Sequence, residues 1–327
     1  MKNPMRRLAS LTAALCLTLS LSACSSNTDA DQSAQSASAD SVEVDRSGKG
    51  NFPKVDTHEF GQDPTIEAGK TDDFTTVAVK TLHEGDGAEI TAEDTVLVNY
   101  ELALWDGTKI ESSFESGTPA SFRLNQVIPG WTHGLAGQHV GDRVQIVIPS
   151  QWGYGDVAQG SIPAGSTLVF VVDLIDSSSS VDPQASFLKD AKRTDETLVD
   201  GLTVSEEAGV EPTIEYAEAA AVPTDQSVVT FLKGTGQSIG EDDYVLYRVV
   251  SSLFGDASTQ QSTWGTTLGS MPAHQEGAPI TFDGQTVGSR LVIVSPVTGA
   301  ADGSQSAQAP AASVAVVDIV GILSANK

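Results

Sequence analysis

Residues 96–108, with the sequence VLVNYELALWDGT, decide how this chain folds. Apolar side chains fall on every second position of this stretch: Val96, Val98, Tyr100, Leu102 and Leu104. Asn99 and Glu101 lie between them and point to the opposite face. This alternation predicts a half-buried antiparallel strand. The four residues that follow it, Trp105-Asp106-Gly107-Thr108, have the chemistry of a hairpin turn.

Further strand patterns surround this hairpin along the chain. Residues 143–148 and 168–175 are rich in β-branched side chains, which favour strands. Between 108 and 168, only residues 131–137 leave room for a helix, and it is short. The pattern predicts an α+β fold, in which an antiparallel sheet wraps around one helix.

Three clusters of residues between positions 77 and 176 carry a more specific signal. The clusters are Val98-Asn99-Tyr100 with the hairpin turn, then Val127-Ile128-Pro129-Gly130-Trp131, then Tyr154-Gly155 with Ile162-Pro163 and Ser166-Thr167-Leu168-Val169-Phe170. In this order and spacing they resemble the FKBP-type peptidyl-prolyl cis-trans isomerases. The resemblance implies an antiparallel half-barrel around one helix, and catalysis of rotation about X–Pro peptide bonds.

The resemblance also implies a role for each matching residue. The catalytic set is Tyr100, Glu111, Trp131, Tyr154 and Phe170. The substrate-binding set is Ile110, Phe122, Val127, Ile128 and Ile162. Trp131 would form the floor of an apolar pocket, and Tyr154 would donate its hydroxyl to a substrate carbonyl. Bond rotation requires no nucleophile, metal ion or cofactor, and macrolide inhibitors are the further ligands that the resemblance implies.

Two positions depart from the family pattern. The family usually has Phe-Asp-Ser-Ser after the first hairpin, where this chain has Ile110-Glu111-Ser112-Ser113. Ser116 stands where many members have an arginine partner for that acid. These departures bear on the rate, the substrate preference and the affinity for macrolides. Taken alone, several of the apolar site residues would fit ordinary core packing equally well, and Glu111 would fit a solvated strand end.

The chain contains a second copy of the same domain. Gly61–Glu67 (GQDPTIE) recurs as Gly209–Glu215 (GVEPTIE), and Val140–Arg143 (VGDR) recurs as Val287–Arg290 (VGSR). We expect two half-barrels, each wrapped around a short helix. The first would span residues 61–176, and the second would span 200–327 after a linker at 177–199 that contains a helix-like stretch from residue 187.

The second copy has lost the residues of the pocket. Val249 aligns with Tyr100, and Ala278 aligns with Trp131. A low-complexity stretch at 299–312 replaces the loop that carries Tyr154. We therefore expect residues 200–327 to form a degenerate FKBP-like domain without isomerase activity.

The N-terminus indicates export and lipid attachment. Three cations precede an apolar run at residues 8–21, and Leu21-Ser22-Ala23-Cys24 resembles the lipobox of bacterial lipoproteins. Residues 1–23 are expected to be a signal peptide, and lipidated Cys24 is expected to hold the protein on the extracytoplasmic face of the bacterial cell membrane. A plain cleaved signal with an incidental cysteine is the alternative. Residues 24–60 are polar and are expected to be a disordered tether.

The net charge of −25 over 327 residues narrows the functional classes. It argues against a nucleic-acid binder, which needs a basic face, and against electrostatic docking on anionic lipids. The favoured function is a lipid-anchored isomerase that acts on proline-containing segments of unfolded or secreted proteins. Two alternatives stay open: a peptide-binding holdase without rapid catalysis, and an acidic surface-binding or structural lipoprotein.

Overall fold

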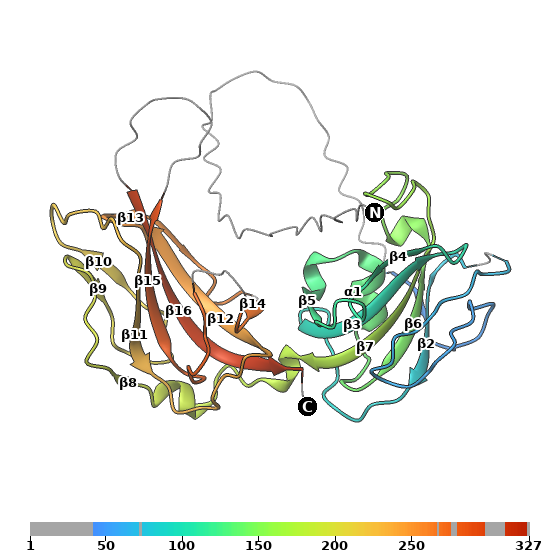
Figure 1. Cartoon of the computed structure of the whole chain (residues 1–327), viewed down its shortest axis with the longest axis horizontal. Helices are drawn as coiled ribbons and strands as arrows, with labels where there is room; N and C mark the ends of the chain where they lie inside the picture. Colours follow the sequence, from blue (N-terminus) through green and yellow to red (C-terminus); the bar gives the residue numbers. More distant parts are fainter. Residues whose placement is uncertain (1–41, 72–73, 267, 276–279, 298–310, 326–327) are drawn as a thin grey trace, which may run out of the picture. The chain divides into compact units, whose positions relative to one another are not determined.

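The computed structural model describes residues 42–71, 74–266, 268–275, 280–297 and 311–325. Each copy of the repeat forms one seven-stranded sheet, coloured blue to green for the first and yellow to red for the second (Figure 1). Within the described ranges, no helix is long and apolar enough to cross a membrane.

The first sheet has the order β1-β2-β6-β7-β3-β4, and β5 also pairs with β3. Its strands are β1 (Val44–Asp45), β2 (Val77–His83), β3 (Thr95–Leu104), β4 (Lys109–Ser112), β5 (Ala120–Arg123), β6 (Arg143–Ile148) and β7 (Leu168–Ser177). All neighbours are antiparallel except β1 and β2, which are parallel. The strands predicted at 96–104, 143–148 and 168–175 are confirmed.

Helix α1 (Pro129–Leu135) packs against the inner face of this sheet (Figure 1). It begins two residues before the predicted 131–137, at a proline whose missing N–H costs nothing in the first turn. A Cβ added to Gly130 would lie 2.3 Å from Cγ2 of Ile148, so glycine is what lets the helix approach β6 closely. The helix thereby closes the inner core of the first copy.

The tether predicted for residues 24–60 is wrong over 42–60, which are ordered against the first sheet. Phe52 and Val55 pack on its outer face with Ile66, and β1 extends the sheet edge. The side chain of Gln145 donates to the carbonyl of Pro53 at 2.9 Å. Composition does not predict this ordered segment, because a few apolar residues in a polar stretch are enough to hold the segment in place when the sheet face below them is apolar. Residues 1–41, with Cys24, lie outside the described residues.

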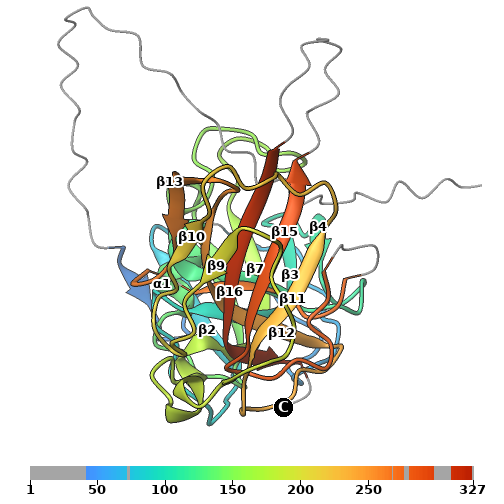
Figure 2. The same ribbon diagram turned by 90° about the vertical axis from the view of Figure 1, so that its left-hand side faces the viewer.

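The second sheet has the order β13-β12-β16-β15-β11-β8, and β14 also pairs with β12. Its strands are β8 (Lys192–Arg193), β11 (Ser227–Lys233), β12 (Asp243–Leu253), β13 (Asp256–Ser262), β14 (Gly269–Pro272), β15 (Arg290–Val297) and β16 (Ala311–Ser324). A separate hairpin of β9 (Leu202–Val204) and β10 (Ile214–Tyr216) lies over its outer face (Figure 2).

The expectation of a helix in each copy is confirmed only for the first. Over the described part of 200–325, the second copy contains strands and turns but no helix. Equivalent turn hydrogen bonds mark Ala273 and Phe282 as the counterparts of Leu124 and Leu135, and the connection between them is two residues shorter. Residues 276–279 of this connection lie outside the described residues.

The segment between the copies is more structured than a plain linker. Like the first copy, which has 3₁₀ turns at Leu124–Gln126 and Ser150–Trp152, it contains two such turns, at Ser178–Ser180 and Ser186–Lys189. Residues 192–193 then form β8, which pairs with β11 of the second sheet. The helix-like stretch predicted from residue 187 is therefore wrong, because one short turn and an edge strand occupy it.

A buried ion pair repeats in both copies. In the first, Nε of Arg143 lies 2.5 Å from Asp173, and its Nη2 donates to the carbonyl of Gln62 at 2.5 Å. In the second, Nε of Arg290 lies 2.6 Å from Asp318, and its Nη2 donates to the carbonyl of Val210 at 2.7 Å. Each arginine thus ties its sheet to the upstream segment that carries the repeated GQDPTIE or GVEPTIE motif.

Candidate active site

Four aromatic rings meet on the inner face of the first sheet. Trp131 is at their centre, with ring centroids 5.0 Å from Phe122, 5.3 Å from Phe170 and 5.8 Å from Tyr100. All three pairs are edge-to-face, an arrangement that aromatic quadrupoles favour. The side chains come from β3, β5, β7 and the first turn of α1. We call this set the aromatic box.

Strand register explains why these rings converge. On β3, Tyr100 lies opposite Val172, and Leu102 lies opposite Phe170 of β7. Phe122 of β5 lies opposite Val96, which points to the same inner face. Because side chains alternate between faces, these positions all project toward α1. Trp131 is only 4% exposed and closes the box from the helix side.

The other predicted site residues surround the box at different depths. Ile162 is buried in the same core, while Ile110, Val127 and Ile128 are partly buried and pack against it. Tyr154 is 37% exposed and lies in the loop after the 3₁₀ turn 150–152. The structure therefore brings the apolar set together and leaves the Tyr154 side chain accessible from solvent.

Glu111 and Tyr100 interact across the hairpin. The Tyr100 hydroxyl donates a hydrogen bond to the Glu111 carboxylate. Burial, this hydrogen bond and the charge of Glu111 raise the pKa of Tyr100 above its ordinary value. Ser116 does not replace the arginine of the family pattern, because its hydroxyl donates to the carbonyl of Ser113 at 2.8 Å. Glu111 thus orients Tyr100 at the edge of the box despite its extra methylene.

The same region of the second copy is mostly aliphatic. Val249 lies opposite Val317, in the register that Tyr100 has in the first copy, and Ala278 lies outside the described residues. The inner core here combines aliphatic residues with Phe282, Tyr247 and Met271. No ring-to-ring contact occurs among its described residues, so the structure shows no second aromatic box.

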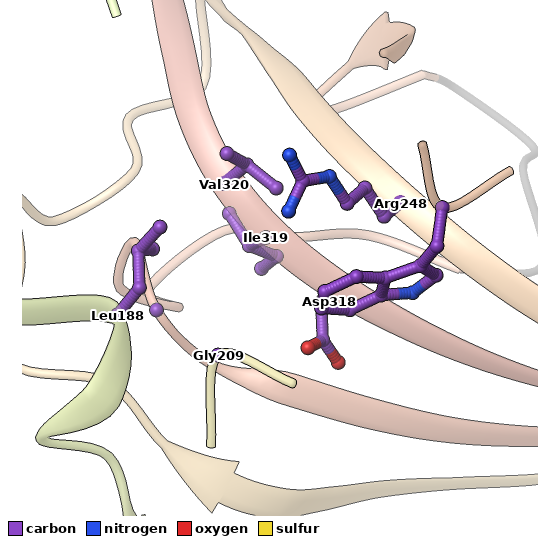
Figure 3. A pocket seen from close by; sticks show the side chains of 8 residues that line it. Leu188, Gly209, Arg248, Asp318, Ile319 and Val320 are labelled. Carbon is purple, nitrogen blue, oxygen red and sulfur yellow. The ribbon is translucent and has the colours of Figure 1, made fainter. Parts of the chain in front are cut away.

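A small cavity in the second copy borders this inner core. Arg248, Asp318 and Leu188 line it, as Figure 3 shows, and the Arg248 guanidinium lies 4.8 Å from the ring centroid of Trp264. Its volume of about 10 Å³ is room for one water molecule. The cavity is therefore too small to be a peptide site.

Sequence reasoning missed one charged pair beside the site. Lys109 lies 2.9 Å from Glu101 and 2.7 Å from Glu115, and the Glu101 side chain is buried. Lys109 directly precedes Ile110, so this pair lies on the strand that carries two predicted site residues, Ile110 and Glu111. In the sequence, this ion pair is indicated only by the alternation that places Glu101 on the outer face of β3.

Comparison with known proteins agrees with this geometry. The family model for FKBP-type peptidyl-prolyl cis-trans isomerases matches residues 87–175. The FKBP-type peptidyl-prolyl cis-trans isomerase FkpA of Aeromonas hydrophila is 50% identical over 91 residues, which are 28% of this chain and 34% of that protein. The FK506-binding protein of Streptomyces anulatus is 41% identical over 104 residues, which are 30% of this chain and 84% of that protein.

A solved structure shows the same partial overlap. The crystal structure of FkpA from Escherichia coli is similar over 32% of this chain and 48% of that chain, with 42% identity and a TM-score of 0.31. The chain belongs to the FKBP-type peptidyl-prolyl cis-trans isomerase family through its first copy. It spans only about a third of the length of the Aeromonas relative. The family model ends at residue 175, ahead of the second copy.

Proposed function

We propose that the first copy catalyses cis-trans isomerisation of X–Pro peptide bonds. The observation that carries this proposal is the aromatic box, an apolar surface of four rings with the Tyr100 hydroxyl held at its edge by Glu111. The substrate proline ring would lie against Trp131, which the other three rings surround.

The chemistry follows from the nature of the amide bond. Resonance sets a rotation barrier of about 18–20 kcal/mol, and twisting the bond lowers its dipole. An apolar pocket therefore favours the twisted state more than water does, since water solvates the planar amide better. The exposed Tyr154 hydroxyl would hold a substrate carbonyl, a hydrogen bond worth about 1 kcal/mol.

The substrates we propose are proline-containing segments of unfolded or secreted proteins. The predicted signal peptide at residues 1–23 and the lipobox-like sequence that ends at Cys24 support a location on the extracytoplasmic face of the membrane, where such clients emerge. Macrolide inhibitors would enter the same box. Ile110, in place of the usual aromatic wall, would weaken their binding.

The test uses the chain from residue 25 onward and a short X–Pro peptide whose cis-to-trans conversion is timed. We expect acceleration by the parent, none by Trp131→Ala, and full acceleration by the matched control Trp264→Ala, which lies in the second copy. Removing a buried tryptophan costs about 3–5 kcal/mol, so circular dichroism must show a folded variant. Trp131→Leu, which keeps apolar contacts, is the second variant.

A folded parent that fails to accelerate the conversion overturns the enzyme proposal. The aromatic box would then serve peptide binding alone. In that case the protein would suppress aggregation of an unfolded client only in molar proportion to the client, as a holdase does.

A further inference from the structure

The hairpin that carries Ile110 and Glu111 contains a β-bulge. Glu101 pairs with Ser112, Leu102 pairs with Glu111, and Ala103 pairs with Lys109. Ile110 is thus the extra residue on β4, without a partner on β3. Bulges of this kind re-aim side chains and occur often beside active sites.

The bulge separates the side chains of β4 between the two faces of the sheet. Ile110 packs against the inner core, and Glu111 reaches Tyr100 on the same side. Lys109 reaches Glu101, which lies on the outer face of β3. In a regular strand Lys109 and Glu111 would share one face, because side chains alternate with a period of two. The bulged register is therefore what brings both Ile110 and Glu111 to the aromatic box.

An ion pair whose carboxylate is buried, between Lys109 and Glu101, favours this register over its alternatives. The Glu101 side chain is 3% exposed, its Oε2 lies 2.9 Å from Nζ of Lys109, and the carboxylate accepts a hydrogen bond from the backbone amide of Ile66. A buried carboxylate is costly unless it is paired and hydrogen-bonded. Any slip of β4 that carries Lys109 away would leave Glu101 without its cation.

Among the residues that the structure describes, the second copy has neither this pair nor the box. Val250 stands opposite Ser262, where the first copy has Glu101 opposite Ser112. β13, the counterpart of β4, contains no lysine and has a different irregularity between Ser251 and Leu253. The ion pair is therefore found in the copy that has the aromatic box, and it is not a shared feature of the two described sheets.

We propose that Glu101 and Lys109 are positioning residues for the isomerase site. They hold β4 in the register that turns Ile110 and Glu111 toward the aromatic box, and they act through those two residues without touching substrate. This inference rests on the proposed function, since it concerns the same site.

The test compares Glu101→Gln, Lys109→Met and Lys109→Arg with the matched control Glu115→Gln, in the chain from residue 25 onward. Glu115 contacts the same lysine from the exposed side, so the control removes a charge without uncovering a buried one. We expect kcat/KM to fall by about tenfold in Glu101→Gln and Lys109→Met, because small misplacements of site residues have large effects. Lys109→Arg and Glu115→Gln should stay within about twofold of the parent.

A second readout follows the register itself and does not depend on activity. Cross-strand nuclear Overhauser contacts between Ala103 and Lys109, and between Leu102 and Glu111, should weaken in Glu101→Gln and persist in Glu115→Gln. A purely structural role would lower the melting temperature while leaving these contacts intact. Unchanged contacts together with unchanged kcat/KM in Glu101→Gln overturn the inference. An inactive parent overturns only the proposed function, because the contacts still report the register.

Discussion

The two copies share their outer face and differ on their inner face. Both have an antiparallel sheet, an upstream segment over that sheet and a buried arginine–aspartate pair between the two. Only the first has α1 and the aromatic box among the residues that the structure describes. The comparison teaches that the sheet frame does not depend on the pocket, because different side chains and different contacts stabilise each.

The largest difference we expect concerns the repeated ion pair. Breaking a fully buried pair costs about 3–5 kcal/mol, because the remaining charge stays uncompensated. In the first copy both side chains are fully buried, whereas Asp318 in the second is 13% exposed. Arg143→Met should therefore lower the free energy of unfolding, measured in urea, by more than Arg290→Met does. A smaller loss for Arg143→Met would contradict the shared-frame comparison.

The absence of a described helix in the second copy predicts unequal effects at matching valines. Val79 lies opposite Ile146 and is 2% exposed, whereas Val228 lies opposite Ile293 and is 43% exposed. Val79→Ala should cost about 2 kcal/mol of stability, because it leaves a cavity under α1. Val228→Ala should change stability by less than about 0.5 kcal/mol. Equal losses of stability in the two variants, measured by thermal unfolding, would mean that both valines are buried to the same extent.

A smaller effect is expected at the rim of the first copy's site. Tyr154→Phe removes one hydroxyl that would hold a substrate carbonyl, a hydrogen bond of about 1 kcal/mol. The expected result is a fall in kcat/KM of about fivefold, with unchanged stability. Tyr216→Phe in the second copy is the control and should leave kcat/KM unchanged. An unchanged rate in Tyr154→Phe would remove Tyr154 from the catalytic set.

The smallest expected effect is the pH response of Tyr100. Burial, the hydrogen bond to Glu111 and its charge raise the pKa of Tyr100. A raised pKa keeps the hydroxyl protonated to higher pH, so the site should not lose its donor near pH 10, where free tyrosine ionises. The ratio of kcat/KM between parent and Tyr100→Phe should stay constant from about pH 7 to pH 10. A parent rate that falls to that of Tyr100→Phe within this range would contradict this.

The sequence predicted the features that rest on local periodicity and on the order of motifs. The alternation around Tyr100 identified β3, and the family motifs grouped Trp131, Phe122 and Phe170 into one site. These residues were predictable because each lies on a regular strand or at a helix start marked by proline. Their roles in catalysis stay predictions until activity is measured.

Features that depend on partners distant in sequence were not predictable. Phe52 and Val55 order a polar segment only because an apolar outer sheet face lies below them. The bulge at Ile110 depends on a contact between Lys109 and a buried carboxylate on the neighbouring strand. Composition and periodicity describe one segment at a time, and neither reports such pairings.

One measurement tests most directly the claim that the prolyl site lies in the first copy alone. The cis-to-trans conversion of an X–Pro peptide is timed with the parent and with folded Trp131→Ala at equal concentrations. We predict acceleration by the parent and the uncatalysed rate with Trp131→Ala. Acceleration by the parent that persists in folded Trp131→Ala would place activity outside the aromatic box and contradict the claim.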